Sequence, residues 1–493
     1  MIPRVDFPIA DPTAAKKLGA ALRKLDYSED GICGLLGDEA FETGQRDAPV
    51  HLRRLPATKL ATAVRLLFLQ LPVPVDEATQ AFGKGGLDAL ERTGFVTIDR
   101  EVVPRSRITA IGDVLLASDG FSRDVDDPAD YVATYTPTSR LLDVLTPRPR
   151  VGRAIDVGTG PGIHALLAAR HSDVAVATDV NPRALAYTAL NAALNGLDNV
   201  EVRHGSLFEP AGDETFDLIT CNAPFVVSPE RRWTYRDAGY EADELSALVV
   251  REAARHLADG GFAALLVSWV AHDEDEPDER AVAWVEASGC DGWILPVFDA
   301  DPLEHAAGWN DHLATDPDEF GAVVDAWTQY LGERGVERVT EGAILLRKRS
   351  DGRKPELRID EVEEDELGPA SDQVLLAFEN RERLRGMKRK ELLAARVAPA
   401  MPLSVELAVP ARRNGHALVH LEEGTCSDLE TPPEAARALE RLDGATELEA
   451  AIDPAFERQT LTLVRELLEL GALRFATWDR AGRPGGRSGR GAS

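Results

Sequence analysis

Three glycines stand at alternate positions, Gly158, Gly160 and Gly162, between an apolar run and a segment with helical periodicity. Because glycine has no Cβ, such a turn lets a ligand approach the main chain and lets a helix pack closely on the preceding strand. The spacing Gly-x-Gly-x-Gly differs from the Gly-x-Gly-x-x-Gly of a dinucleotide-binding turn, and Asp156 precedes it. The stretch therefore predicts a small-ligand site at the end of a strand.

An acidic residue, Asp179, stands about 20 residues further along, at the end of the apolar run VAVATDV. A carboxylate in this position accepts hydrogen bonds from both hydroxyls of a ribose. The alternative is an ordinary strand-end turn, which the sequence Asp-Val-Asn-Pro also suits. Together with the glycine turn, Asp179 favours ribose binding.

A third motif, Asn-Ala-Pro-Phe at residues 222–225, follows the apolar run FDLITC. Ligands bind open α/β sheets at the carboxyl ends of the strands. The glycine turn, Asp179 and this motif each come directly after a predicted strand, so we expect them at one edge of a sheet.

The segment from about 150 to 349 alternates predicted strands and helices, which is typical of a doubly wound α/β fold. Most of the first five strands are rich in apolar residues, as buried parallel strands are. The predicted strands are RAIDVG, VAVATDV, NVEVRHG, FDLITCN, GFAALLVSW, GWILPVFD and GAILLRK. The acidic run at 271–280 is expected to be a solvated loop after the fifth strand.

The segments on either side are predicted to be smaller domains. Residues 1–130 have helical periodicity followed by a hairpin pattern at 94–119, an order typical of a winged-helix domain. Residues 131–349 make up the α/β domain. Residues 350–478 combine a hairpin with three helices and a strand and are again winged-helix-like, whereas the Gly/Arg-rich tail at 479–493 is expected to be disordered.

A linker with an acidic start, residues 122–145, leads into the α/β domain. Its second half predicts an amphipathic helix with Thr138 as the N-cap. The winged-helix-like segment before it carries little positive charge on its second short helix, which favours packing or substrate docking over DNA binding.

The composition narrows the range of partners. Lys and Arg number 55 against 84 Asp and Glu, a net charge of −29, which repels phosphates and makes nucleic acid the less expected partner. No apolar run reaches the length of about 18 residues that a membrane span needs, and the first residues lack a signal-peptide core. A cytoplasmic location with no membrane partner is therefore expected. The four cysteines form no CxxC pair, which argues against a zinc site.

On these motifs, the stretch from about Arg153 to Lys348 resembles a class I S-adenosylmethionine-dependent methyltransferase. The motif at 222–225 and the segment PRALAYTALNAALNG make it most similar to the branch that contains release-factor glutamine methyltransferases and N2-guanine ribosomal RNA methyltransferases. The resemblance implies a Rossmann-like sheet of seven strands and S-adenosylmethionine as the cofactor.

The resemblance also implies which residues surround the cofactor. Asp156 and the turn from Gly158 to Gly162, with Gly160 between them, would enclose the methionine part. Asp179 would bind the ribose, and Asn181 would lie beside the adenine.

One position departs from the family pattern near the adenine. The sequence Gly-Ser-Leu-Phe stands where the family usually has Gly-Asp-Leu-Phe, so Ser206 replaces an aspartate that bonds the adenine amino group. Serine is shorter and uncharged. The resemblance therefore implies either a weaker hold on adenine or a contact made by the backbone of Leu207.

By the same resemblance, Asn222 is the pivot of the reaction and lies beside both cofactor and acceptor. In the family motif, the asparagine oxygen and the next carbonyl, here that of Ala223, accept hydrogen bonds from the substrate nitrogen. The aromatic residue, here Phe225, stacks on the planar acceptor. Ala223 replaces a proline and loses its fixed φ, although Pro224 still restricts Ala223 to extended geometry. The motif is interpreted as modified yet functional; the alternative is an oxygen or carboxylate acceptor.

The segment after this motif is rich in aromatic and ionic groups and is expected to cover the open side of the cofactor. Tyr235, Arg236 and Asp237 are its candidates for substrate contact, with a loop packed for structure as the alternative. His305, in a second substrate-side segment, is interpreted as structural.

The expected function is methyl transfer to a nitrogen of a peptide, a protein or a small molecule. The C-terminal helices weakly resemble modules that bind leader peptides of ribosomal peptide natural products, which favours a peptide. Alternatives are a guanine-N2 ribosomal RNA methyltransferase, an O- or carboxyl-methyltransferase on a peptide or natural product, and a winged-helix regulator that only senses the cofactor.

Overall fold

The computed structural model describes residues 6–37, 40–41, 47–122, 127–222, 224–230, 240–273, 275–363, 367–408 and 415–476. Two compact units make up the chain. The first comprises residues 1–140, 151–292 and 299–357, and the second comprises 141–150, 293–298 and 358–493.

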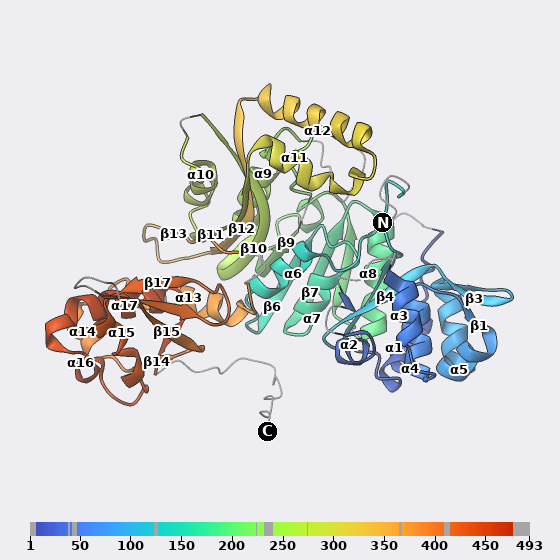
Figure 1. Ribbon diagram of the computed structural model, residues 1–493, viewed down its shortest axis with the longest axis horizontal. Coiled ribbons are helices and arrows are strands. Elements are labelled where there is room, and N and C mark those ends of the chain that lie inside the picture. The colour runs from blue at the N-terminus through green and yellow to red at the C-terminus, as the bar shows by residue number, and fades with distance from the viewer. Residues whose placement is uncertain are drawn as a thin grey trace. The chain divides into compact units, whose positions relative to one another are not determined.

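A sheet of eight strands, in the order β13-β11-β12-β10-β9-β6-β7-β8, carries the predicted α/β fold (Figure 1). Its strands from β6 to β10 pair in parallel, and β12 runs antiparallel to β10. The bounds are β6 (Val151–Val157), β7 (Ser172–Asp179), β8 (Val200–His204), β9 (Phe216–Cys221), β10 (Leu257–His272), β11 (Asp291–Ala300), β12 (Val336–Arg347) and β13 (Leu357–Ile359).

The doubly wound α/β class is confirmed, and each of the seven predicted strands is present. The prediction of seven strands is wrong by one, because β13 adds an edge strand. Its three residues are half-buried or exposed, so the sequence there carries no apolar run that would mark a strand.

Helices connect these strands, and the strand order reverses beside β6, which lies between β7 and β9. This reversal is where an open α/β sheet binds its ligand, at the carboxyl ends of the strands. The helices are α7 (Ile163–Ala169), α8 (Pro182–Asn195), α9 (Glu244–His256), α10 (Glu279–Ser288), α11 (Pro302–Trp309) and α12 (Pro317–Gly332). The acidic run at 271–280 begins in the last two residues of β10 and ends in the first two of α10, so the predicted loop is too long at both ends.

The N-terminal elements are mostly helical and include two hairpins where one was predicted. Strands β1, β2 and β3 form one small sheet in the order β1-β3-β2, and β4 pairs with β5. The elements are α1 (Pro12–Lys24), α2 (Glu29–Leu36), α3 (Ala48–Arg54), α4 (Lys59–Ala63), the π-helical turn η3 (Val64–Phe68), β1 (Val73–Pro74), α5 (Val75–Arg92), β2 (Val96–Ile98), β3 (Glu101–Pro104), β4 (Ser106–Ile111) and β5 (Val114–Asp119). Tyr187, Leu190 and Leu194 of α8 belong to the same apolar core as these elements.

Helix α6 (Pro137–Leu145) begins one residue before the predicted N-cap. The Thr136 hydroxyl accepts the hydrogen bond from the Ser139 amide, at 3.2 Å. The prediction that Thr138 caps the helix is therefore wrong; the proline that follows Thr136 suits the first helical position, so the cap moves one place earlier.

The second unit contains the predicted C-terminal hairpin, since β15 pairs antiparallel with β16. Three short or medium helices and a final strand follow, in the predicted order. The elements are α13 (Ser371–Leu384), α14 (Arg389–Leu393), β14 (Val397–Pro399), β15 (Leu403–Ala408), β16 (His416–Leu421), β17 (Asp428–Thr431), α15 (Pro433–Ala436), α16 (Leu448–Ala451), α17 (Glu457–Glu469) and β18 (Leu473–Phe475). In the described part of the chain, no helix has the length and apolarity to span a membrane.

Candidate active site

The glycine turn lies between β6 and α7, and its three glycines all have positive φ: 71° at Gly158, 56° at Gly160 and 99° at Gly162. Residues other than glycine rarely adopt a backbone conformation with positive φ. A Cβ added at Gly162 would stand 2.8 Å from the methyl carbon of Thr188 on α8, whereas one at Gly160 would meet no atom within 4 Å. Gly162 is thus required for helix packing, and Gly160 faces open space that a ligand can enter.

Asp156, at the end of β6, is only 1% exposed and bonds entirely within the protein. Its carboxylate accepts hydrogen bonds from Thr220 Oγ1 at 2.9 Å, Thr159 Oγ1 at 2.6 Å and the Ala165 amide at 3.1 Å. Burial raises the pKa of this carboxyl, and these bonds oppose that rise. Asp156 therefore ties β9 and α7 to the glycine turn; its expected contact with the methionine part stays a prediction.

Asp179, at the end of β7, bridges the glycine turn and the start of α8. Its carboxylate accepts hydrogen bonds from the Gly160 amide at 2.9 Å and the Asn181 amide at 2.8 Å. Burial raises the pKa of this carboxyl as well. Asp179 is thus brought against Gly160; its expected contact with the ribose stays a prediction.

Asn181 has a structural role that the sequence did not reveal. Its side-chain oxygen caps α8 by accepting from the Arg183 amide at 2.9 Å, and its Nδ2 donates to the Asp130 carbonyl at 2.9 Å. The neighbouring Val180, by contrast, is 44% exposed. An apolar side chain exposed beside Asp179 is suited to cover a flat base. The sequence signal for Val180 was its position at a strand end, between the polar residues Asp179 and Asn181.

The turn after β8 lies against the end of β7. Thr178 Oγ1 donates to the Leu207 carbonyl at 3.1 Å, and the Gly205 amide donates to the Asp179 carbonyl at 3.1 Å. Leu207 has a positive φ of 47°, which is uncommon for a residue with a side chain. Ser206 is half-buried in the same turn. The structure therefore brings Ser206 and Leu207 to the strand edge that carries Asp179.

Asn222 follows β9, one residue after the register pair of Val157 and Cys221 in β6 and β9. It therefore lies beside Gly158, the residue that follows Val157. Its Nδ2 donates to Thr138 Oγ1 at 3.4 Å. Thr138, in the first turn of α6, therefore contacts Asn222 instead of capping the helix.

Phe225 is held on two sides. Its carbonyl accepts a hydrogen bond from the Ser268 hydroxyl of β10, and its ring meets the Trp309 ring edge to face, with centroids 6.4 Å apart and planes at 79°. The Trp309 indole N–H donates to Glu341 of β12. The ring therefore has a supporting layer from the last part of the sheet, which no sequence motif indicated.

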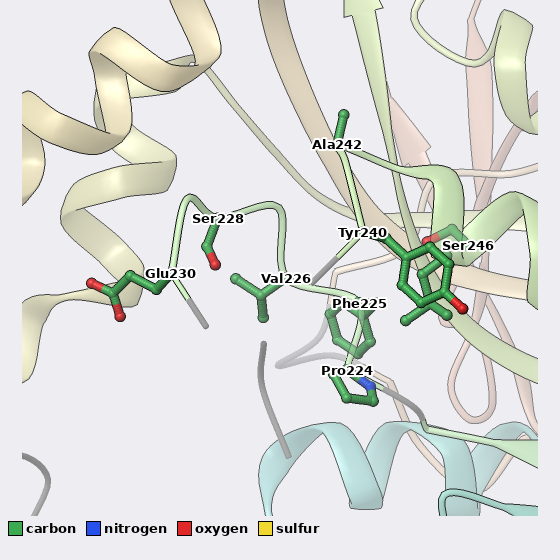
Figure 2. A pocket seen from close by; sticks show the side chains of 9 residues that line it. Pro224, Phe225, Val226, Ser228, Glu230, Tyr240, Ala242 and Ser246 are labelled. Carbon is green, nitrogen blue, oxygen red and sulfur yellow. The ribbon is translucent and has the colours of Figure 1, made fainter. Parts of the chain in front are cut away.

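Phe225 also lines a small pocket that is open to solvent (Figure 2). In this view Glu230 stands at the opposite end from Tyr240 and Ser246. The lining residues are Pro224, Phe225, Val226, Ser228, Glu230, Tyr240, Ala242, Leu245 and Ser246. The pocket adjoins the motif that is expected to hold the acceptor.

Ala223 and the substrate candidates Tyr235, Arg236 and Asp237 lie outside the described residues. His305 is fully buried, its Nε2 lies 2.9 Å from the Val227 carbonyl, and burial lowers the pKa of the imidazole. Among the described residues, no group of three or more His, Cys, Asp or Glu is arranged to hold a metal ion.

Comparison with known proteins matches two families. The Methyltransferase small domain matches residues 134–272, and a domain of unknown function, DUF7059, matches residues 24–106. The release factor glutamine methyltransferase of Cereibacter sphaeroides is 33% identical over 242 residues, which cover 46% of this chain and 79% of that protein. The chain belongs to the class I S-adenosylmethionine-dependent methyltransferases.

Two further relatives of this methyltransferase match over shorter shares of their length. The ribosomal protein uL3 glutamine methyltransferase of Bradyrhizobium diazoefficiens is 29% identical over 225 residues, covering 42% of this chain and 63% of that protein. The release factor glutamine methyltransferase of Aquifex aeolicus is 33% identical over 150 residues, covering 27% of this chain and 51% of that protein. The chain thus spans between half and two thirds of the length of these two relatives.

The residues of this methyltransferase fit S-adenosylmethionine. The open space at Gly160 admits a ligand to the backbone, the Asp179 carboxylate lies beside it, and the exposed side chain of Val180 offers an apolar surface. A ligand with apolar and hydroxyl groups can therefore enter at these strand ends; which part of the cofactor each residue contacts stays a prediction.

Proposed function

We propose that this methyltransferase transfers the methyl group of S-adenosylmethionine to a planar nitrogen, in the class of a side-chain amide, on a protein or peptide. The observation that carries the proposal is the place of Asn222, which lies at the end of β9 beside the glycine turn and is followed by the braced ring of Phe225. S-adenosylmethionine supplies a methyl group on a positively charged sulfur.

The side chains of the chain itself orient the acceptor. Because Nδ2 of Asn222 donates to Thr138, its amide oxygen is turned to accept a hydrogen bond from the acceptor N–H. The carbonyl of Ala223 is the second proposed acceptor, and the Phe225 ring stacks on the planar group. Holding the nitrogen in line with the methyl group accounts for most of the expected rate gain.

Two observations favour a protein acceptor. The curated relatives are named for glutamine methylation of release factors and of ribosomal protein uL3. The net charge of −29 disfavours an RNA acceptor. An RNA methyltransferase would lose substrate affinity steeply as salt is raised, and an oxygen acceptor would yield a base-labile ester or an ether instead of an N-methyl amide.

The other finer predictions are kept as proposals. The helix and strand order from α4 to β3 and the sheet order β1-β3-β2 support a winged-helix-like N-terminal domain. We retain the domain bounds 1–130, 131–349 and 350–478, with a winged-helix-like C-terminal domain. A cytoplasmic location, from composition, is retained in the same way.

The test uses labelled S-adenosylmethionine, the purified full chain and a size-fractionated lysate of the source cell, treated with protease or ribonuclease. Label that becomes protease-sensitive supports the proposal, and label that becomes ribonuclease-sensitive overturns it. The variant Asn222→Ala should lose at least about tenfold in transfer rate while binding the cofactor. Full activity in Asn222→Ala would remove the assigned role of this residue.

A further inference from the structure

Helix α8 presents every fourth residue to the N-terminal elements: Arg183, Tyr187, Asn191 and Asn195. Residues four apart lie on one face of a helix. All four side chains form hydrogen bonds with residues of β5, whose last residue is Asp119. One face of α8 is therefore a continuous polar seam against the N-terminal elements.

The two asparagines pair with the backbone of β5 as a neighbouring strand would. Asn191 accepts from the Ala117 amide and donates to the Ala117 carbonyl, both at 2.8 Å. Asn195 accepts from the Leu115 amide at 2.9 Å and donates to the Leu115 carbonyl at 2.7 Å. These bonds satisfy backbone groups of an otherwise open strand edge, so separating β5 from α8 would leave them unpaired.

Near the start of α8 the seam centres on Asp119, the last residue of β5, which is 7% exposed. Arg183 forms a salt bridge with Asp119, and the Tyr187 hydroxyl donates to the same carboxylate at 2.9 Å. Arg183 also bonds the carboxylate and the carbonyl of Asp130, which is the carbonyl that receives the Asn181 side chain. Asn181, which caps α8 beside the proposed ribose site, is thus held by Asp130, in the segment that follows β5.

The same helix also fixes the glycine turn. Thr188 Oγ1 donates to the Gly160 carbonyl at 2.9 Å, and Asn191 Nδ2 donates to the Pro161 carbonyl at 2.8 Å. Asn191 therefore contacts β5 and the turn with one amide group. A shift of α8 would move the turn, the cap and Asp179 together.

We propose that the N-terminal elements are a fixed part of the cofactor site, acting from β5 through the polar face of α8. Tyr187 and Asn195 are positioning residues, because they touch the N-terminal elements and act on the cofactor through the helix. The inference rests on the proposed function in taking S-adenosylmethionine as the ligand.

The test measures binding of S-adenosylhomocysteine to the full chain by calorimetry, which needs no acceptor. Tyr187→Phe keeps the ring that stacks on Phe95 and removes only the hydroxyl. Asn195→Ala removes the pairing with Leu115. Each variant should weaken S-adenosylhomocysteine binding about threefold to tenfold, since each loses one or two net hydrogen bonds from the seam. The KM for the acceptor should stay within about twofold.

Tyr27→Phe is the matched control. Its hydroxyl is equally buried and donates to the Ile108 carbonyl at 2.6 Å, wholly within the N-terminal elements. It should lower the melting temperature without changing S-adenosylhomocysteine affinity. If Tyr187→Phe and Asn195→Ala, checked as folded by melting, bind S-adenosylhomocysteine as the wild type does, the proposal is overturned. A rise in acceptor KM alone would instead assign these elements to acceptor docking.

The test of the α8 coupling and the test of the proposed function can fail independently. A wild-type chain that binds S-adenosylhomocysteine but methylates no protein contradicts the proposed function and leaves the α8 coupling measurable. A wild-type chain that does not bind it contradicts both.

Discussion

Ser268 and Glu341 are register partners across the antiparallel pair of β10 and β12. Paired residues in such strands project from the same face of the sheet. Ser268 bonds the carbonyl of Phe225, and Glu341 bonds the indole of Trp309, whose ring supports that of Phe225. One register pair of the sheet therefore holds the backbone of Phe225 directly and its ring through Trp309. Phe225 is the residue that is proposed to stack on the acceptor.

Trp309→Phe removes the indole N–H that Glu341 accepts, so the Phe225 ring loses its fixed support. We expect kcat/KM for the acceptor to fall about tenfold to a hundredfold, because small displacements of a positioning group are costly. The affinity for S-adenosylhomocysteine should stay within about twofold. Steady-state kinetics beside calorimetry provides the measurement.

Trp284→Phe on α10 is the control for this prediction, since the ring of Trp284 lies against the guanidinium of Arg280. Ser268→Ala, which frees the Phe225 carbonyl, should act in the same direction as Trp309→Phe. An equal loss of cofactor affinity in Trp309→Phe would show that the tryptophan supports the whole fold instead of the acceptor side.

Alanine at the two glycines should separate stability from binding. Gly162→Ala places a methyl against Thr188 and strains a φ of 99°, so we expect a loss of about 1–3 kcal/mol in the free energy of unfolding. Gly160→Ala meets no atom within 4 Å, and its φ of 56° is a conformation that other residues adopt at lower cost. It should mainly lower S-adenosylhomocysteine affinity. Denaturant unfolding measures the stability of both variants, and calorimetry measures their affinity for S-adenosylhomocysteine. If Gly162→Ala lowered the affinity more than Gly160→Ala did, the space at Gly160 would not hold the cofactor.

The imidazole of His305 should make the fold sensitive to mild acid. Burial lowers its pKa below the usual 6.5, although Glu341 Oε1 lies 3.5 Å from Nδ1 and favours the charged form. A base with a depressed folded-state pKa contributes stability that is complete above the unfolded pKa and is lost as the pH falls through the folded one. The melting temperature should therefore decrease as the pH drops below 6.5.

His305→Gln tests this, because glutamine keeps an N–H for the Val227 carbonyl and has no proton to gain. Between about pH 6.5 and pH 5, the melting temperature of the variant should fall less than that of the wild type. Parallel profiles for the two proteins would show that the imidazole is not responsible.

Val180→Ser should weaken S-adenosylhomocysteine binding by about threefold to tenfold, since an apolar cover for the adenine is lost. The melting temperature should hardly change, because the side chain is 44% exposed. Val103→Ser, at a valine of similar exposure, 41%, on the hairpin strand β3, is the control and should leave binding unaltered. Unchanged binding in Val180→Ser would place the adenine elsewhere.

The amino-acid sequence alone predicts the α/β class, the seven main strands and the places of Asp179 and Asn222 at strand ends. These follow from local patterns: apolar runs mark buried strands, and glycines or polar residues at their ends mark a ligand edge. A strand of three residues such as β13 has no such pattern, and the sequence offers two threonines, on either side of Pro137, as the cap of α6.

The residues that support this site are brought together by long-range packing. Tyr187 and Asn195 look like ordinary polar positions on a helix, and Trp309 and Glu341 lie far along the chain from Phe225. Their roles depend on which face of α8 meets β5 and on the register of β10 with β12. Both are properties of long-range packing, because a hydrogen bond between distant segments leaves no periodic trace in either segment alone.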